Sequence, residues 1–461
     1  MTRIVAISNR VAQPKRSKSS GGLAVGLLAA LEKHGGVWFG WSGRTCSGEP
    51  GDPKLTQSGK IQYATIDINE QEYDAYYNGF SNNTLWPLLH YLLGFFSFSR
   101  ANYNAYCRVN ALFARKLVPL LKPDDVIWVH DYHLIPLAAE LRRAGVEQPI
   151  GFFLHVPFPG FDVMRVLPCY QHILRALASY DVLGFQTRRD LSSFFDCVTQ
   201  PGTGGTVLDA NRVSAFGKTL TADVFPIGVD VDDCQALAEE HSHDTQVERL
   251  ARRIGDRNLI IGVDRLDYSK GLVERFRGYE SLLVNYPAIR GRAEFLQIAP
   301  PTRGGVRAYD DIRHDLERAA GNINGRFADI NWMPIRYLNR AYGRPVLMSL
   351  LRLASVGLVT PIRDGMNLVA KEYVASQDPE NPGMLVLSTL CGAAEELTDA
   401  VLVNPYDRQG VADGLHRAIE MGLPERKERH RSMLAILKKY DIHNWSESFI
   451  EALTSNQAGG A

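Results

Sequence analysis

The sequence carries no excess of charge of either sign. Lysine and arginine together number 51, aspartate and glutamate also number 51, and the chain has 461 residues. Binding to nucleic acid depends on a basic surface that neutralises phosphates, so this balance argues against a nucleic-acid partner. Any anionic ligand must therefore be held by a few local cations.

Cysteines are few, and none of them form a closely spaced pair. This spacing predicts reduced thiols and argues against a disulfide framework or a zinc site; the six cysteines are Cys46, Cys107, Cys169, Cys197, Cys234 and Cys391. Long hydrophobic runs are also absent. The best candidate for a membrane span, residues 346–358, is interrupted by Arg352, and the apolar run at residues 4–8 is too short for a signal peptide. These absences predict a cytoplasmic protein that has no membrane partner.

Short apolar runs recur along the chain and are separated by longer amphipathic stretches. Continuous runs rich in β-branched residues are typical of strands that are buried on both faces. The first series lies at residues 4–8, 126–130, 150–156, 182–186 and 224–229, and the second at residues 259–263, 295–299, 330–333, 356–360, 384–388 and 400–403. Helical patterns lie between them, at residues 22–33, 110–121, 272–285 and 311–320. Alternating strands and helices predict an α/β protein in which two doubly wound, Rossmann-like domains each contain a parallel sheet.

The length also favours two domains, because 461 residues exceed what one hydrophobic core usually serves. We place the boundary where the strand-like residues 228–230 give way to an acidic helix at residues 232–240. The expected domains are therefore residues 1–231 and 232–444. The last helix, residues 445–461, is then free to pack back on the first domain.

Polar and charged side chains follow most of the apolar runs. In open parallel sheets, ligands bind beyond the carboxyl ends of the strands, so these side chains are candidate site residues. In the first half they are Arg10, Asp131, His133 and His155, and in the second half Arg265, Asp267, Lys270, Arg303, Arg363 and Asp364. Strand ends carry polar residues in many proteins, but cations and carboxylates at so many successive ends favour a site for an anionic ligand.

The segment 265–271 places Arg265 and Lys270 in one turn that ends at Gly271. Fixed cations stabilise the negative charge that develops on a departing diphosphate, so this turn is a candidate catalytic loop. The alternative is a surface ion pair between Arg265 and Asp267. The glycine favours the catalytic interpretation, because it lets the loop wrap around an anion.

Two glycine-led segments open helices. Residues 19–26 contain Gly21 and Gly22, and residues 364–372 begin with Asp364 and Gly365. Glycine lets the backbone approach a ligand closely, and a helix N-terminus attracts an anion. Glu372, further along the second helix, is a candidate acceptor for a ribose hydroxyl.

These residues resemble the trehalose-6-phosphate synthase family, which comprises retaining glucosyltransferases of the two-domain GT-B fold. The likeness runs almost from end to end and is strongest at residues 128–133 (WVHDYH), 155–159 (HVPFP), 265–271 (RLDYSKG) and 363–372 (RDGMNLVAKE). The resemblance implies two Rossmann-like domains that face a central cleft, the first binding the acceptor and the second the nucleotide sugar. It also implies transfer of glucose from UDP-glucose, or another nucleotide-glucose, to glucose 6-phosphate, giving α,α-trehalose 6-phosphate with retained configuration.

The resemblance implies a role for each matching position. Catalytic roles are implied for Arg265, Lys270, Asp364 and His155. Donor binding is implied for Gly21, Gly22, Arg265, Lys270, Tyr342, Leu368, Val369, Ala370, Lys371 and Glu372. Acceptor binding is implied for Arg10, Tyr77, Trp86, Asp131 and Arg303. Without the resemblance, Tyr77 and Trp86 are ordinary core or surface aromatics.

The resemblance implies no cofactor and no obligatory metal ion, and it implies a homo-oligomer, because the family often forms one. The donor base stays open between uridine, guanosine and adenosine. A glucosylglycerol-phosphate synthase that uses glycerol 3-phosphate is one alternative, and a catalytically silent regulatory homologue is another. The complete set of implied residues favours an active enzyme that uses a hexose phosphate. The basic loop at residues 12–18 departs from the family pattern and is either a mobile lid or a solvated loop.

Overall fold

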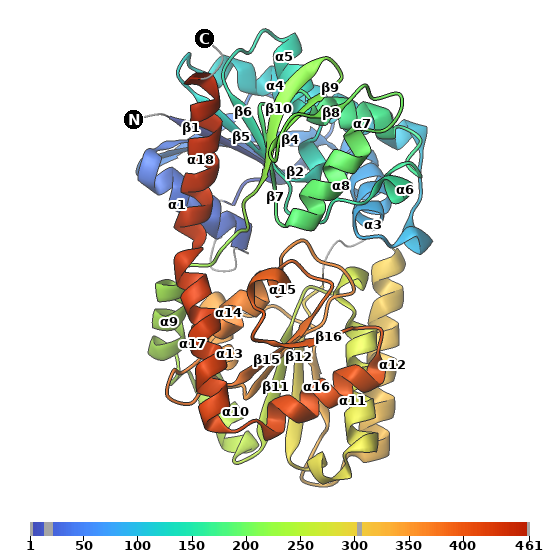
Figure 1. Cartoon of the computed structure of the whole chain (residues 1–461), viewed down its shortest axis with the longest axis vertical. Coiled ribbons are helices and arrows are strands. Elements are labelled where there is room, and N and C mark those ends of the chain that lie inside the picture. The colour runs from blue at the N-terminus through green and yellow to red at the C-terminus, as the bar shows by residue number, and fades with distance from the viewer. Residues whose placement is uncertain (1–2, 13–21, 302–306, 459–461) are drawn as a thin grey trace. The chain divides into compact units, whose positions relative to one another are not determined.

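A computed structural model describes residues 3–12, 22–301 and 307–458 of the chain (Figure 1). The chain divides into two compact units, of which unit 1 comprises the residues up to Ile227 and those from Ile442, and unit 2 comprises Gly228–Asp441. The domain boundary expected after residue 231 therefore lies just inside the first helix of unit 2. The last helix begins at Ile442, a few residues before its expected start at 445.

Unit 1 contains a ten-stranded sheet in the order β3-β4-β2-β1-β5-β6-β7-β10-β9-β8. The strands from β4 to β10 in this order are parallel, whereas β3, β9 and β8 run antiparallel to the strands that they pair with. The strands are β1 (Ile4–Arg10), β2 (Gly36–Cys46), β3 (Lys54–Ser58), β4 (Ile61–Asn69), β5 (Val126–His130), β6 (Ile150–Phe153), β7 (Val182–Phe185), β8 (Thr206–Val207), β9 (Arg212–Ala215) and β10 (Lys218–Val224).

The helices of unit 1 include a long π-helix, η2 (Asp74–Leu85), beside the α-helices. The α-helices are α1 (Gly22–His34), α2 (Glu70–Tyr73), α3 (Trp86–Leu89), α4 (Arg100–Leu117), α5 (Leu137–Arg143), α6 (Phe161–Met164), α7 (Tyr170–Leu177), α8 (Arg188–Val198) and α18 (Ile442–Ala458). Short 3₁₀ turns are η3 (Leu93–Phe95), η4 (Val118–Leu120) and η5 (Tyr132–Leu134).

Unit 2 contains a six-stranded sheet in the order β13-β12-β11-β14-β15-β16, and all its strands are parallel. The strands are β11 (Asn258–Val263), β12 (Ala293–Ile298), β13 (Ile335–Leu338), β14 (Val356–Val359), β15 (Met384–Ser388) and β16 (Val401–Val403). The helices are α9 (Val231–Glu240), α10 (Thr245–Ile254), η6 (Tyr268–Lys270), α11 (Leu272–Asn285), η7 (Pro287–Ile289), α12 (Arg307–Phe327), α13 (Arg344–Leu353), α14 (Leu368–Ser376), α15 (Ala393–Glu396), α16 (Arg408–Glu420) and α17 (Leu423–Lys439).

In each unit the order of the parallel strands reverses at one place, beside the first strand of that unit. In unit 2 the chain moves outward from β11 through β12 to β13 and then returns to β14 on the other side of β11. In unit 1 it moves from β1 through β2 to β4 and then returns to β5 beside β1. This confirms the predicted α/β class with two doubly wound, Rossmann-like units. Ligands of such sheets bind at the carboxyl ends of the strands that flank the reversal, here β1 and β5, and β11 and β14.

Two predicted strands are wrong. Residues 330–333 form a loop, because the Asp329 carboxylate accepts a hydrogen bond from the Asn331 amide at 2.8 Å and closes a turn, and Ile330 is fully exposed. The strand that follows, β13, begins at Ile335. Residues 225–229 continue beyond the end of β10, where Pro226 has no N–H to offer a neighbouring strand.

The hydrophobic cores explain why most of the other predicted strands exist. Six strands are buried along their whole length, as is typical of strands in parallel sheets: β5, β6, β7, β12, β14 and β15.

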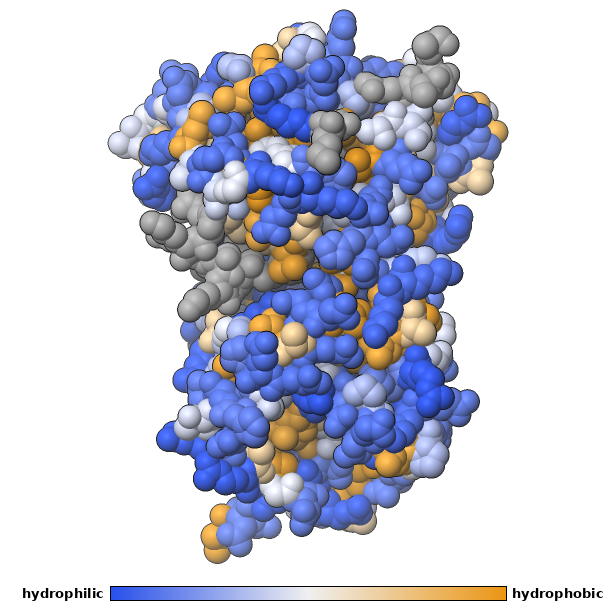
Figure 2. Space-filling model, turned by 90° about the vertical axis from the view of Figure 1, so that its left-hand side faces the viewer, coloured by the Kyte–Doolittle hydropathy of each residue, from blue (hydrophilic) through white to orange (hydrophobic). Residues whose placement is uncertain are grey.

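The face in Figure 2 carries mainly hydrophilic side chains, with hydrophobic residues in separate small groups. Within the described residues, no helix has both the length and the apolar character that crossing a bilayer demands.

Candidate active site

In unit 2 a lysine and an aspartate meet where β11 and β14 end. Lys270 Nζ donates to Asp364 Oδ2 at 2.5 Å, and both side chains are only slightly exposed. Asn367 Nδ2 donates to the same Asp364 oxygen at 3.0 Å. The two residues are far apart in the sequence, and the reversal of strand order brings them together. Arg265, in the same loop as Lys270, has an exposed side chain.

The loop that carries Lys270 is fixed by its own short-range hydrogen bonds. The Asp267 carboxylate caps η6, accepting from the Ser269 amide at 3.0 Å and from the Ser269 hydroxyl at 2.9 Å. Gly271 has a φ of 61°, and a Cβ at this position would lie 2.7 Å from the Thr360 carbonyl oxygen. Only glycine fits this close approach without strain, so the loop is held directly against the end of β14.

A buried arginine is hydrogen-bonded both to the loop that carries Lys270 and to the segment that follows β14. Arg275, on α11, is fully buried and pairs with Asp264 Oδ2 at 2.6 Å. Its other hydrogen bonds reach Thr360 Oγ1 at 3.0 Å, Gln297 Oε1 at 3.0 Å and the Lys270 carbonyl oxygen at 3.4 Å. Sequence reasoning missed this residue. The available signal was a charged side chain beside Leu272, Phe276 and Tyr279 on the apolar face of a helix, where a charge needs buried partners.

Helix α14 presents its N-terminus next to Asp364. The backbone of Asn367 has a φ of 93°, which is unusual for a residue other than glycine. Its side-chain Oδ1 accepts a hydrogen bond from the Ala370 amide at 3.2 Å. The amides of Leu368 and Val369 begin the helix at this point. A helix N-terminus in this position is a ready site for an anionic group.

Two further residues of α14 have charged partners. Lys371 is fully buried and its Nζ lies 2.5 Å from Glu396 Oε2, so its ammonium group neutralises a protein carboxylate. Burial lowers the pKa of Lys371, and Glu396 opposes this shift. Burial raises the pKa of Glu372 to about 7, although Arg344 Nε lies 3.8 Å from its carboxylate. Tyr342 lies half-buried before α13, and its hydroxyl accepts from Arg340 Nε at 2.7 Å.

In unit 1 an aspartate and two histidines meet where β5 and β6 end. Asp131 has a φ of 74°, and its Oδ1 accepts from the His155 amide at 3.3 Å. The ring nitrogens His130 Nδ1 and His155 Nε2 lie 3.2 Å apart. Burial lowers the pKa of His155 to about 3 and that of His130 also well below its ordinary value, so both rings are neutral near pH 7. The pair can exchange hydrogen bonds but carries no charge.

Arg10 and Tyr77 belong to one aromatic cluster in unit 1. The Arg10 guanidinium lies over the Trp41 ring at 5.6 Å, and the Trp41 and Tyr77 ring centroids are 6.3 Å apart. Tyr77 stacks on His133 at 5.6 Å with an interplanar angle of 11°. Tyr77 comes from the π-helix η2, a conformation that often marks functional sites and that no periodicity in the sequence indicated.

Of the remaining predicted residues, the structure describes Trp86 and Gly22. Trp86 is 4% exposed and packs against His90 and Tyr132, at centroid distances of 4.0 Å and 5.7 Å, so its ring is part of the interior of unit 1. Gly22 is the first residue of α1. Gly21, Arg303 and nearly all of the basic loop lie outside the described residues. Within the described part of the chain, no group of three His, Cys, Asp or Glu side chains is placed to hold a metal ion.

Residues 4–455 match the model of glycosyltransferase family 20. The chain is 50% identical to the trehalose-6-phosphate synthase of Klebsiella pneumoniae over 455 residues, which is 98% of this chain and 95% of that protein.

Solved structures are also similar to this chain, both in sequence and in fold. An α,α-trehalose-phosphate synthase (UDP-forming) from Burkholderia xenovorans, in complex with glucose-6-phosphate, is 50% identical, with a TM-score of 0.95 over 98% of this chain and 100% of that one. A trehalose-6-phosphate protein from E. coli, bound with UDP-2-fluoro glucose, is 49% identical, with a TM-score of 0.94 over 98% of this chain and 99% of that one.

Proposed function

Because the chain belongs to glycosyltransferase family 20, we propose that it transfers glucose from UDP-glucose to glucose 6-phosphate and forms α,α-trehalose 6-phosphate and UDP. The observation that carries the proposal is the Lys270–Asp364 pair beside the N-terminus of α14, at the strand reversal of unit 2. The relatives that bind glucose-6-phosphate and a UDP-glucose analogue support the choice of both substrates.

Unit 2 is proposed to bind the donor. Lys270 and Arg265 face the diphosphate as fixed cations, and the first amides of α14, at Leu368, Val369 and Ala370, add hydrogen bonds. The Glu372 carboxylate accepts a hydrogen bond from the ribose. Tyr342 lies near the base. Lys371 acts indirectly, since its ammonium group is engaged with Glu396.

Unit 1 is proposed to bind the acceptor. Arg10 holds the phosphate of glucose 6-phosphate, because a guanidinium group suits a phosphate dianion. Tyr77 walls the sugar ring, and the Asp131 carboxylate accepts from its hydroxyls. Trp86 supports this wall from the interior, where its ring is buried.

The reaction is proposed to retain configuration without a carboxylate nucleophile. The Asp364 carboxylate accepts hydrogen bonds from Lys270 and Asn367, so its charge is already balanced and it is suited to orient the donor glucose. The departing phosphate takes the proton of the acceptor hydroxyl, while Arg265 and Lys270 stabilise the charge that develops on the diphosphate.

A crossed substrate assay tests the proposal. UDP-glucose, GDP-glucose and ADP-glucose are each combined with glucose 6-phosphate or glycerol 3-phosphate, and release of the nucleoside diphosphate is measured. We expect the fastest release with UDP-glucose and glucose 6-phosphate. Faster release with glycerol 3-phosphate would indicate the glucosylglycerol-phosphate alternative, and no release from any pair would indicate a silent homologue. We also propose that the protein is cytoplasmic and forms a homo-oligomer. Light scattering of the purified protein measures its molar mass and tests the oligomer.

A further inference from the structure

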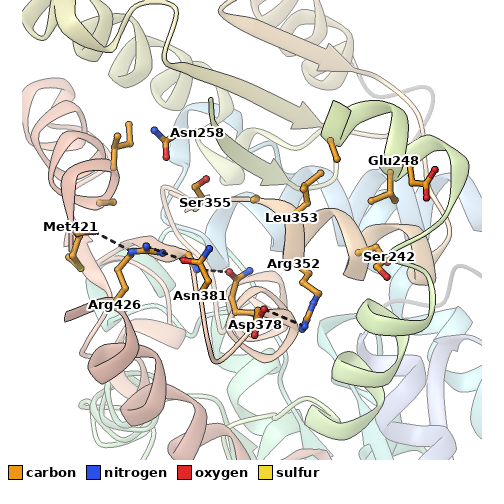
Figure 3. Close-up of a pocket in the computed structure, with 18 residues that line it drawn as sticks. Ser242, Glu248, Asn258, Arg352, Leu353, Ser355, Asp378, Asn381, Met421 and Arg426 are labelled. Carbon is orange, nitrogen blue, oxygen red and sulfur yellow. Dashed lines mark hydrogen bonds and ion pairs between the residues drawn. The ribbon is translucent and has the colours of Figure 1, made fainter. Parts of the chain in front are cut away.

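A polar cavity of about 540 Å³ lies in unit 2, at the edge of the sheet opposite the Lys270–Asp364 pair (Figure 3). Its walls include Asn258, Ser355 and Gly383, which stand at the amino ends of β11, β14 and β15. The donor loops leave the carboxyl ends of β11 and β14, so the parallel sheet separates the two places. The volume is within the range of small-molecule sites.

One wall of the cavity holds a cation without a carboxylate partner. Arg426, on α17, donates from Nε to the Met421 carbonyl oxygen at 3.2 Å, from Nη2 to Asn381 Oδ1 at 3.2 Å, and from Nη1 to the Pro382 carbonyl oxygen. All three acceptors are uncharged, and none of the carboxylates in the described ranges lies within ion-pair distance of this guanidinium. These hydrogen bonds fix its position and leave donors for a ligand.

A second arginine is only loosely paired. Arg352 Nη2, at the end of α13, lies 3.6 Å from Glu239 and 3.9 Å from Asp378, longer than hydrogen bonds. Figure 3 shows Arg426 pointing toward Asn381 and Arg352 pointing toward Asp378, along one side of the cavity. An anion with several oxygens can therefore bind Arg426 and compete with Glu239 and Asp378 for Arg352.

The acidic residues of the cavity already face cations. Glu248 lies 3.7 Å from Arg252 Nη2, and Asp378 faces Arg352. Among the described residues of the lining, Arg426 is a cation with no carboxylate within ion-pair distance. Hydroxyl and amide groups make up much of the remaining lining, from Ser242, Ser349, Ser355, Asn258 and Gln377. This combination suits a ligand that carries one anionic group and several hydroxyls.

Helix α14 joins the cavity to the proposed donor site. Its first residues form that site, and the carbonyl oxygen of its last residue, Ser376, accepts from Arg352 Nη1 at 3.4 Å. Helix α13 contacts α14 at the other end as well, because Arg344 Nε lies 3.8 Å from Glu372. A ligand that draws Arg352 toward itself thus acts on both helices, and a rigid helix transmits the change over its length of about 13 Å.

We propose that this cavity is a regulatory site for a small hydroxylated anion, a phosphate ester or a carboxylate, whose binding changes the affinity of unit 2 for the nucleotide. The inference rests on the proposed function only through its readout, which is the binding of UDP. Coupling between two such sites is typically fivefold or more in affinity, and it is reciprocal.

Calorimetric titration of UDP tests the inference. The titration is carried out alone and with glycerol 2-phosphate, glycerate or uncharged glycerol present. We expect glycerol 2-phosphate or glycerate to change the UDP dissociation constant by roughly fivefold or more, and glycerol to have no effect. The change should disappear in Arg426→Met and persist in Arg431→Met, which removes an exposed arginine from the same helix outside the cavity.

A second variant covers the case in which Arg426→Met does not fold. Ala251→Phe, on α10, fills the cavity without removing a side-chain contact, and it should abolish the effect while leaving UDP binding intact. An unchanged UDP affinity with both anions in the wild type would overturn the inference. So would an effect that persists in both cavity variants, because the anions would then act at the substrate sites. Absence of any UDP binding would instead contradict the proposed function.

Discussion

Lys270 has two roles, one in the free protein and one in the proposed reaction. Its ammonium group balances Asp364 at 2.5 Å in the free protein and is proposed to stabilise the departing diphosphate during the reaction. Replacing Lys270 by alanine should therefore lower kcat by roughly 100- to 1,000-fold, the usual effect of losing one group that stabilises transition-state charge. Steady-state kinetics measure the change.

The matched control for this variant is Lys438→Ala, which removes an exposed lysine from α17. Circular dichroism should give the same spectrum for both variants and the wild type. Near-normal turnover in Lys270→Ala would exclude the role in charge stabilisation. A comparable loss in Lys438→Ala would show that the change reflects net charge alone.

Glu372 predicts a pH dependence of nucleotide binding. Burial raises its pKa to about 7, so the carboxyl is neutral below this pH and becomes ionised as the pH rises through it. The ionised form is the better acceptor for a ribose hydroxyl. The affinity for UDP should therefore increase with pH around 7, and this contribution should vanish in Glu372→Gln.

The terminal phosphate of UDP titrates in the same range, with a pKa near 6, so the measured quantity is the difference between wild type and Glu372→Gln. Identical pH profiles would contradict contact between Glu372 and the ribose. The same raised pKa acts on folding with the opposite sign. An acid whose folded pKa exceeds its ordinary value binds protons more readily when folded, so this group reduces stability as the pH rises from about 4.5 to 7.

At the scale of elements, α11 carries the prediction that concerns Arg275. This arginine joins Asp264, Thr360 and the carbonyl of Lys270 from one guanidinium group. Lysine keeps the charge but cannot make all of these hydrogen bonds, so Arg275→Lys should fold and yet hold the donor loops less firmly. We expect the KM for UDP-glucose to rise roughly tenfold, the equivalent of one lost charge-assisted hydrogen bond, and the KM for glucose 6-phosphate to stay unchanged.

Two comparisons separate positioning from mere stability. Arg275→Met leaves Asp264 buried without its cation and should cost about 3–5 kcal/mol of unfolding free energy, in contrast to Arg275→Lys. Arg277→Met, on the same helix but 45% exposed, should change neither stability nor KM. If Arg275→Lys lost stability while its donor KM remained normal, Arg275 would have a purely structural role.

The elements also show which parts of the fold a sequence can predict. Strands such as β5, β14 and β15 are nearly continuous apolar runs, and they lie where predicted, because burial on both faces leaves a clear pattern. Strands β3 and β8 were missed, because their side chains are exposed and carry no such pattern. Strands β2, β4, β9 and β13 were also missed, although β4 and the first half of β2 are largely buried. The switch-point strand ends were predictable from the polar residues that follow them. The positive φ of Asn367 and the π-helix that holds Tyr77 were not, since tertiary contacts fix both.

At the scale of the whole molecule, the chain passes between the two units twice, after Ile227 and after Asp441. The two crossings are adjacent, because a Cβ on Gly228 would lie 2.4 Å from the Asp441 carbonyl carbon. The second crossing returns the chain to unit 1, where α18 lies beside α1 (Figure 1). The last helix is thus part of the core of unit 1, although the whole of unit 2 separates it in sequence from the rest of unit 1.

This arrangement predicts that α18 controls the stability of unit 1. Phe449 is fully buried and stacks on Trp128 at 4.9 Å, so Phe449→Ala should cost about 3–5 kcal/mol of unfolding free energy. The loss should appear in the denaturant transition of unit 1, followed by tryptophan fluorescence because five of the six tryptophans lie in that unit, and should leave the transition of unit 2 unchanged. Glu451→Ala, on the exposed face of the same helix, is the control and should shift neither transition. An equal shift in both transitions would mean that the units unfold as one body, because α18 would then stabilise the molecule as a whole.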